Sequence, residues 1–153
     1  MKKNICTVLV MLICLCVLAG CGGKDPTVES VLQQLKDAGL SITYEIVYTK
    51  DNDPNGSKAH DYIQKGNFAD SNIEPQYSKA QPESGSIEIF SSNKKATKRA
   101  EYLQIFTTLD NMQSQVISGK VLLRLNNSYS KSDVEKFAKA IGGKVVTFAN
   151  SAE

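Results

Sequence analysis

The chain has 153 residues, of which 41% are hydrophobic and 22% are charged, and its formal net charge is +2. This length suits one domain with one hydrophobic core. The positive excess comes from Lys2 and Lys3. Without them 16 basic and 16 acidic residues remain, a balance that argues against a strongly basic nucleic-acid binder.

The N-terminus is typical of an exported protein. Two lysines precede an apolar run between residues 5 and 18, which predicts a secretory signal peptide over residues 1–20 and is too short for a comfortable membrane span of about 20 residues. The run ends in Leu-Ala-Gly-Cys at Cys21, which resembles a bacterial lipobox. In such proteins the cysteine thiol receives a diacylglyceryl group, and two acyl chains give a stable anchor. An ordinary cleaved signal peptide, with Cys21 as a free thiol, is the alternative.

The cysteine positions agree with a lipobox. The other three cysteines, at positions 6, 14 and 16, leave with the signal peptide, so the mature chain forms no intramolecular disulfide. Residues 21–25 then form a tether that spans about 15 Å at most. We therefore expect a lipoprotein that is anchored through Cys21, with acyl chains such as palmitate, at the extracytoplasmic face of a bacterial cell membrane.

A helix is predicted at the start of the domain, over about residues 26–39. Its apolar residues follow the i, i+3, i+4, i+7 spacing of an amphipathic helix: Val28, Val31, Leu32 and Leu35. Asp25 is the expected N-terminal cap, and Gly39 suits the C-terminal end. Residues 42–49 then alternate in polarity and predict a half-buried strand with Ile42, Tyr44, Ile46 and Tyr48 on one face.

Residues 50–85 lack any regular pattern and carry all but one of the prolines. A loop of this length is uncommon in a compact domain, so it is either functional or contains short elements that the pattern does not reveal.

Regular patterns return at Ser86. Residues 86–91 predict a strand with two inward isoleucines, and a helix with Asn93 as its cap is expected to run to about Asp110. Ser118-Gly119 separates two strand-like runs and predicts a hairpin. A capping-box sequence at Ser130 opens a further helix, and residues 144–148 predict a last short strand. The order favours a single α+β domain over residues 26–150, with one small antiparallel or mixed sheet and helices packed on one face as a two-layer sandwich.

The segment DNDPNG, residues 51–56, begins like a calcium-binding EF-hand loop. Asp51, Asp53 and Asn55 match the first three ligand positions. The last ligand position holds Tyr62 where an EF-hand has a bidentate Glu, and Pro54 fixes φ inside the loop. We therefore favour a turn, with a weak calcium site at Asp51, Asp53 and Asn55 as the alternative, and expect no cofactor.

Catalytic residues are sparse. The only histidine is His60, and no G-x-S-x-G motif surrounds any serine. An enzyme would have to take its acid and base from the 50–85 loop. The candidate loop site, for binding or for this chemistry, consists of Asp53, Asn55, His60, Tyr62 and Asp70.

A basic segment opens the predicted second helix. It consists of Lys94, Lys95, Lys98 and Arg99. Cations at a helix start oppose the helix dipole, while free backbone N–H groups and lysines suit an anion such as a phosphate or a lipid headgroup. The alternative is a solvated helix face.

The second half of the chain resembles a group of small, functionally uncharacterised exported bacterial proteins and lipoproteins. Their motifs are an Asp-Pro-Asn loop, a Phe-x-Asp, a Gly-x-Ile/Val-Glu-Val-Phe strand, an Arg-Ala-x-Tyr helix and a Val-Leu-x-Arg strand. The matching positions here are 53–55, 68–70, 85–90, 99–102 and 121–124. The Gly-Arg-Pro expected after Asp-Pro-Asn is absent, so a ligand held by that arginine in the group would be bound differently here. The resemblance implies an architecture and no activity.

These observations favour a membrane-anchored surface lipoprotein that acts as a non-catalytic binding or accessory module. Its expected partners are membrane lipid through Cys21 and an envelope protein, peptide or polymer, with no nucleic acid. A hydrolase-like enzyme and a calcium- or anion-binding structural module are the alternatives.

Overall fold

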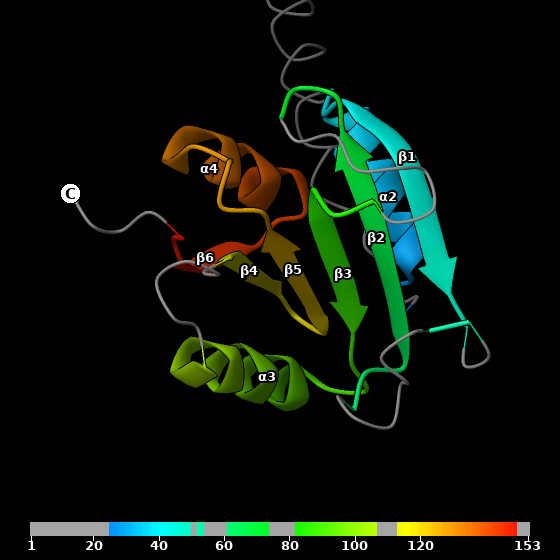
Figure 1. The fold of residues 1–153 in the computed structure, drawn as a ribbon. Helices are drawn as coiled ribbons and strands as arrows, with labels where there is room; N and C mark the ends of the chain where they lie inside the picture. Colours follow the sequence, from blue (N-terminus) through cyan, green and yellow to red (C-terminus); the bar gives the residue numbers. More distant parts are fainter. Residues whose placement is uncertain (1–24, 50–51, 54–60, 74–81, 107–112, 150–153) are drawn as a thin grey trace, which may run out of the picture.

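The structure is a computed structural model, and it describes residues 25–49, 52–53, 61–73, 82–106 and 113–149. The described residues form one six-stranded antiparallel sheet with three helices (Figure 1), which confirms the α+β class. The elements in chain order are α2 (Val28–Asp37), β1 (Ile42–Tyr48), β2 (Gln64–Asp70), β3 (Gly85–Ile89), α3 (Asn93–Phe106), β4 (Ser114–Ser118), β5 (Val121–Leu125), α4 (Lys131–Ala140) and β6 (Lys144–Thr147). The strand order is β1-β2-β3-β5-β4-β6. Among the helices of the described ranges, none combines the length and the apolar content that a membrane crossing requires.

Helix α2 forms as the apolar spacing predicts, but its cap differs. Thr27 accepts a hydrogen bond from the Ser30 backbone, and the Ser30 hydroxyl accepts one from the Thr27 backbone, which is a capping box. The predicted cap, Asp25, instead pairs with Lys120, with 2.5 Å between its Oδ1 and the lysine Nζ. Gly39 follows the helix at a φ of +80°, the left-handed conformation that suits a helix end.

Strand β1 does not keep one alternation along its length. A register shift lies between Ile42 and Tyr44, where β1 pairs with β2. Ile42 therefore packs against the main core together with Val47, while Tyr44 is 39% exposed. A bulge exchanges the two faces of a strand, so the prediction that Ile42 and Tyr44 share a face is wrong.

Strand β2 lies within the segment predicted to be a loop. It pairs with β1 on one side and β3 on the other, and it is buried along most of its length. Only Phe68 supplies a large apolar side chain, and Gly66 and Lys65 interrupt the strand-like composition. The central place of β2 in the sheet, and not its own sequence, explains why it is a strand.

The helices cover both faces of the sheet, so the predicted two-layer sandwich with helices on one face is wrong. The core that contains α2 and α4 includes Ile87 and Leu123, whereas Leu122, next along β5, packs with α3. Two connections cross over a neighbouring strand toward the β6 edge of the sheet: β3-α3-β4 and β5-α4-β6. Their starting strands, β3 and β5, run in opposite directions. Two crossovers of the same hand then place their helices on opposite faces, in agreement with the right-handed rule.

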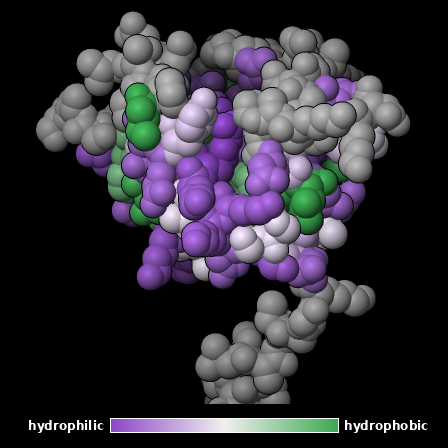
Figure 2. Space-filling model, turned by 90° about the horizontal axis from the view of Figure 1, so that it is seen from below, coloured by the Kyte–Doolittle hydropathy of each residue, from purple (hydrophilic) through white to green (hydrophobic). Residues whose placement is uncertain are grey.

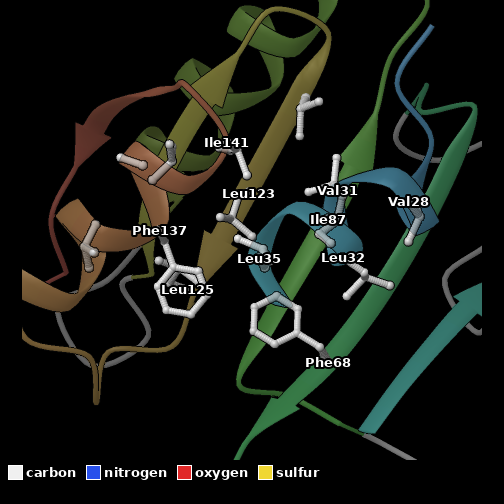
Figure 3. Packing of buried hydrophobic residues seen from close by; sticks show 14 of the residues in the cluster. Val28, Val31, Leu32, Leu35, Phe68, Ile87, Leu123, Leu125, Phe137 and Ile141 are labelled. Carbon is white, nitrogen blue, oxygen red and sulfur yellow. The ribbon is translucent and has the colours of Figure 1, made fainter. Parts of the chain in front are cut away.

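The main core lies between the sheet and the helices α2 and α4 (Figure 3). All four predicted residues of α2 are at most 2% exposed and point toward the sheet. Phe68 and Phe137 stack with ring centroids 5.9 Å apart. The predicted Ser130 cap, the last strand and the Ser118-Gly119 hairpin are all present, and Gly119 takes a φ of +57° at the first position of a two-residue turn.

Candidate functional site

The face of the sheet that carries α3 also holds buried polar side chains, and Glu88 is one of them. Glu88 points to this face because Ile87 and Ile89, on either side of it, point into the main core. Its side chain is 1% exposed. Arg99 of α3 donates from Nε to Glu88 Oε2 at 3.2 Å, and Arg124 of β5 donates from Nη1 to Oε1 at 2.9 Å. Both carboxylate oxygens are therefore held by guanidinium groups, as buried charges require.

Arg124 is fixed on its other side as well. Its Nε and Nη2 donate to Gln113 Oε1 at 2.9 and 2.6 Å. The guanidinium plane is thus bound at both edges, which leaves its orientation little freedom. Arg99 in turn lies against the ring of Tyr102, with its Cζ 5.7 Å from the centroid.

A second charged group adjoins Glu88. Lys65 lies directly opposite Glu88 on β2 and is 7% exposed. Its Nζ is 3.9 Å from Asp53 Oδ1, and it lies over the Tyr48 and Tyr62 rings at 5.2 and 5.9 Å from their centroids. The Tyr62 hydroxyl donates to Asp53 Oδ2. The Asp53 side chain is 2% exposed, so Lys65 and Tyr62 together compensate a buried carboxylate.

This environment shifts the ionisation of its members. Burial lowers the pKa of Lys65, and the Asp53 and Glu88 charges oppose that shift. Burial and the hydrogen bond to Asp53 raise the pKa of Tyr62, and burial together with Asp53 raises that of Tyr48. Burial disfavours whichever form is charged, the ammonium of lysine and the phenolate of tyrosine, which explains the opposite directions.

The turn at DNDPNG brings Asp53 into this group. The Asn52 carbonyl oxygen Oδ1 accepts from the Thr49 backbone at 2.6 Å, and Asp53 donates its backbone N–H to the Thr49 carbonyl at 3.1 Å. These bonds join Thr49 to Asn52 and Asp53 directly after β1, while Pro54, Asn55 and Gly56 of the predicted turn lie outside the described residues. Asp51 and Asn55, the other members of the weak calcium site, lie outside the described residues. Within the described ranges, no three His, Cys, Asp or Glu side chains gather as a metal site would need.

Five polar residues form one row across the same face of the sheet. They are direct neighbours in the strand register, in the order Asn67, Ser86, Arg124, Gln115 and Thr147. With strands about 4.8 Å apart, the row spans about 19 Å. We call these five residues the polar row.

Three members of the polar row have buried atoms without a partner. Among the residues that the structure describes, Asn67 Oδ1, Ser86 Oγ and Gln115 Oε1 are buried and make no hydrogen bond. Ser86 is 9% exposed and Gln115 is 2% exposed. Because an unpaired buried polar atom costs about 1–3 kcal/mol, these three atoms favour partners that the described residues do not provide.

The side chains of the predicted basic segment point in different directions. Arg99 points inward to Glu88, and Lys95 pairs with Asp61 at 2.8 Å. Lys94 and Lys98 are exposed on α3. The Ser92 hydroxyl, and not Asn93, caps the helix by accepting from the Lys95 backbone at 3.3 Å.

The predicted loop site is divided. Asp53 and Tyr62 meet, but Asp70 lies at the opposite end of β2, where it accepts from the Tyr129 hydroxyl at 3.0 Å. Burial and Asp70 raise the pKa of Tyr129. This pair borders a separate pocket of about 180 Å³ between α2 and α4, with Asp133 and Lys136 on its rim. His60 and Asn55 lie outside the described residues, as does the predicted lipidation site Cys21.

The sequence analysis missed Glu88, Lys65, Arg124 and the polar row. Glu88 had a readable signal, since a carboxylate between two inward isoleucines of a strand must face the other side of the sheet. Lys65 and Asn67 had none, because β2 itself was not predicted. Gln115 and Arg124 alternate with apolar residues, a pattern that predicts exposed positions on one face of a sheet. The sequence does not show that α3 lies on that face.

Comparison with known proteins assigns no family. The sequence matches no protein-family model, and no curated protein or solved structure is similar enough to count as a match.

Proposed function

We propose that this protein is a membrane-anchored binding protein of the bacterial envelope, and that it binds a neutral, hydroxyl-rich ligand at the polar row. The observation that carries the proposal is the set of three unpaired buried atoms of Asn67, Ser86 and Gln115 in one row. The anchor rests on the lipobox at Cys21.

The chemistry of the row favours a neutral ligand. The charge of Arg124, its only ionised member, is balanced by Glu88, and three of its five N–H donors already bind Glu88 and Gln113. The unpaired atoms are two side-chain carbonyl oxygens and a hydroxyl, which seek donors more than charges. A sugar supplies several hydroxyl donors along an extended molecule, so a neutral glycan suits the row better than an acidic polymer.

Binding is favoured over catalysis because the strongest charges already have partners. A carboxylate with both oxygens bound to arginines, as in Glu88, is a poor general base. The hydrogen bonds of Arg124 to Glu88 and Gln113 instead pre-organise the polar row, which lowers the entropic cost of binding.

The test combines binding with stability. Gln115→Leu keeps the size of the side chain and removes the unpaired Oε1. Retention of the detergent-solubilised full-length protein on immobilised neutral oligosaccharides should fall at least about tenfold, the effect of one lost hydrogen bond at a buried site. The unfolding free energy should stay the same or rise by about 1 kcal/mol, since a buried atom without a partner is removed.

Gln33→Leu, the same change at an exposed site of α2, is the matched control and should alter neither value. Failure of the wild-type protein to be retained on any neutral oligosaccharide would exclude the proposed ligand. Retention on acidic glycans or peptides instead would contradict the argument from charge. A marked loss of stability in Gln115→Leu would assign Gln115 to structural hydrogen bonding through buried water.

The anchor is tested separately. Radiolabelled palmitate should enter the wild-type protein and not the Cys21→Ala variant, and equal labelling of both would exclude lipidation at this residue.

The group of Asp53, Tyr62 and Lys65 favours a second candidate, proton-transfer catalysis. A buried lysine with a lowered pKa beside a carboxylate and a phenol is an arrangement that enzymes use. Hydrolysis of generic ester substrates by the wild-type protein, abolished in Lys65→Met, would support it; equal rates in both proteins would exclude it.

A further inference from the structure

An ion pair connects the first described residue to the hairpin of the second half of the sheet. Asp25, the first described residue, pairs with Lys120 in the turn between β4 and β5. That turn adjoins the start of α3, because the Lys120 carbonyl accepts from the Phe90 backbone at 2.9 Å and Gly119 lies beside the Asn93 side chain. The chain therefore enters the domain at the end of the sheet where α3 begins.

Helix α3 lies across this end of the sheet, crosswise to the strands (Figure 1). Ala96, Ala100 and Leu103 pack against the sheet residues Leu122 and Ile117. The opposite, outward side of α3 is exposed. It carries Lys94, Lys98, Glu101, Tyr102 and Ile105, and we call these residues the outer stripe.

The outer stripe combines cations with exposed apolar side chains. Tyr102 is 51% exposed and Ile105 is 77% exposed, among the largest exposures of apolar residues in the described ranges. Lys94 and Lys98 make no ion pair with described residues, and Glu101 is the one opposing charge on the stripe. Viewed from this end, the described surface is mainly hydrophilic with isolated apolar groups (Figure 2). Exposed lysines are attracted to anionic lipid headgroups, and an exposed tyrosine beside them suits the headgroup level of a membrane.

We propose that the outer stripe of α3 rests on the membrane, with Lys94 and Lys98 against acidic phospholipid headgroups and Tyr102 and Ile105 at the interface. The inference rests on the proposed lipid anchor at Cys21. Three residues separate Cys21 from Asp25, and the stretch from Cys21 to Asp25 spans about 14 Å at most, so the anchor holds this end of the domain close to the bilayer. The tether keeps the local concentration of headgroups around the domain high. Each lysine contributes only a weak attraction to the anionic headgroups, and with the tether two such contacts are enough to orient the domain.

The orientation places the polar row on the same side of the sheet as α3 but farther from the entry of the chain. Glu88, Lys65 and Leu122 occupy the register position next to α3, and the row follows one step beyond them along the strands. The proposed ligand site would therefore face the space just above the headgroups.

The experiment measures the depth of a label in a protein without another free thiol. Thr97→Cys beside the outer stripe and Ser132→Cys at the start of α4 are each labelled with a fluorophore in the lipidated protein. The protein is reconstituted in vesicles of phosphatidylcholine and phosphatidylglycerol that contain a lipid with a headgroup quencher. The Thr97→Cys label should be quenched strongly and the Ser132→Cys label weakly, and equal quenching at both positions would overturn the proposal.

Charge dependence is the second measurement. Replacing Lys94 and Lys98 by glutamine in the Thr97→Cys protein should lower the membrane-contacting population by about fivefold per lysine, the contribution of one basic side chain near an anionic surface. The matched control, Lys131→Gln with Lys139→Gln on α4, should leave the quenching unchanged. Quenching that is insensitive to the α3 lysines, or unchanged in vesicles of phosphatidylcholine alone, would overturn the headgroup contact.

Failure of the anchor gives a different result from failure of the orientation. Without lipidation, the free Cys21 thiol would itself take up the fluorophore in the protein that carries no added cysteine. With lipidation intact, that protein stays unlabelled and the two quenching values alone decide the orientation.

Discussion

Glu88 links three elements through charge. It lies on β3, and its two oxygens hold Arg99 of α3 and Arg124 of β5, with Lys65 of β2 directly opposite. Because this group is largely buried, each charged arginine is compensated only while the Glu88 carboxylate is present. Removal of one member of such a group costs more than the pair contributes over an apolar replacement.

Glu88→Gln tests this dependence, since it preserves shape and removes the charge. We expect a loss of about 3–5 kcal/mol in the free energy of unfolding, because the two arginines keep their charge without compensation. Urea denaturation followed by circular dichroism measures it. The control is Glu45→Gln, whose partner Lys36 lies in a pair with side chains 38% and 41% exposed. There the loss should stay below about 1 kcal/mol, and similar losses at both sites would contradict the argument.

Tyr62 makes stability depend on pH in the alkaline range. The pKa of Tyr62 is raised in the folded protein above the ordinary value of 10.0, so the unfolded chain releases this proton first. The stabilisation is complete below pH 10 and is lost as the pH rises above it, because only the unfolded state then gains from ionisation.

Tyr62→Phe should therefore flatten the decrease of the unfolding free energy between about pH 10 and pH 12. The measurement is a series of urea denaturations at increasing pH, compared by their slopes against pH. Tyr102→Phe, at an exposed ring, is the control and should retain the wild-type slope. An unchanged slope in Tyr62→Phe would show that Tyr62 is not the group responsible.

At the scale of elements, β2 and β3 pair through a glycine and a phenylalanine. Gly85 lies directly opposite Phe68, and a Cβ at Gly85 would overlap the Phe68 ring. The ring thus fills the space above a residue without a side chain, in the centre of the sheet. Because the Phe68 ring leaves no room for a Cβ at position 85, a glycine occurs here within a fully buried strand.

Gly85→Ala should destabilise the protein by about 1–3 kcal/mol, because the ring must leave its position in a packed core. Phe68→Leu shortens the opposing side chain, so the additional cost of Gly85→Ala in that background should be much smaller. The double-mutant cycle from four urea denaturations measures the coupling between the two positions. Equal costs in both backgrounds would mean that the ring is not the obstacle.

The elements that the sequence predicts well are those with their own periodic pattern. The apolar spacing of α2, the Ser130 cap of α4 and the Gly119 turn are local signals, and the structure confirms each. Strand β2 has no such signal, since Lys65 and Gly66 become buried only through pairing on both sides. The candidate site depends on β2 and on the face chosen by α3, which are tertiary properties, so the sequence revealed only Asp53, Tyr62 and Arg99.

For the molecule as a whole, the absence of disulfides from the mature chain is a sequence-based prediction. Cys21 is the one cysteine expected after removal of the signal peptide, and it is expected to carry lipid. Stability should then come from the core and the charged groups alone. The urea midpoint of the lipidated protein should be the same with and without dithiothreitol, and a lower midpoint under reducing conditions would reveal a cysteine cross-link.

The sheet consists of two halves that meet at one seam. Strands β1, β2 and β3 precede α3 in the chain and β4, β5 and β6 follow it, and β3 pairs with β5. The polar row crosses this seam, with Ser86 on β3 directly opposite Arg124 on β5. A ligand that bonds to Asn67 and Gln115 would hold the halves together, so its presence should slow the rate of unfolding and leave the rate of refolding almost unchanged.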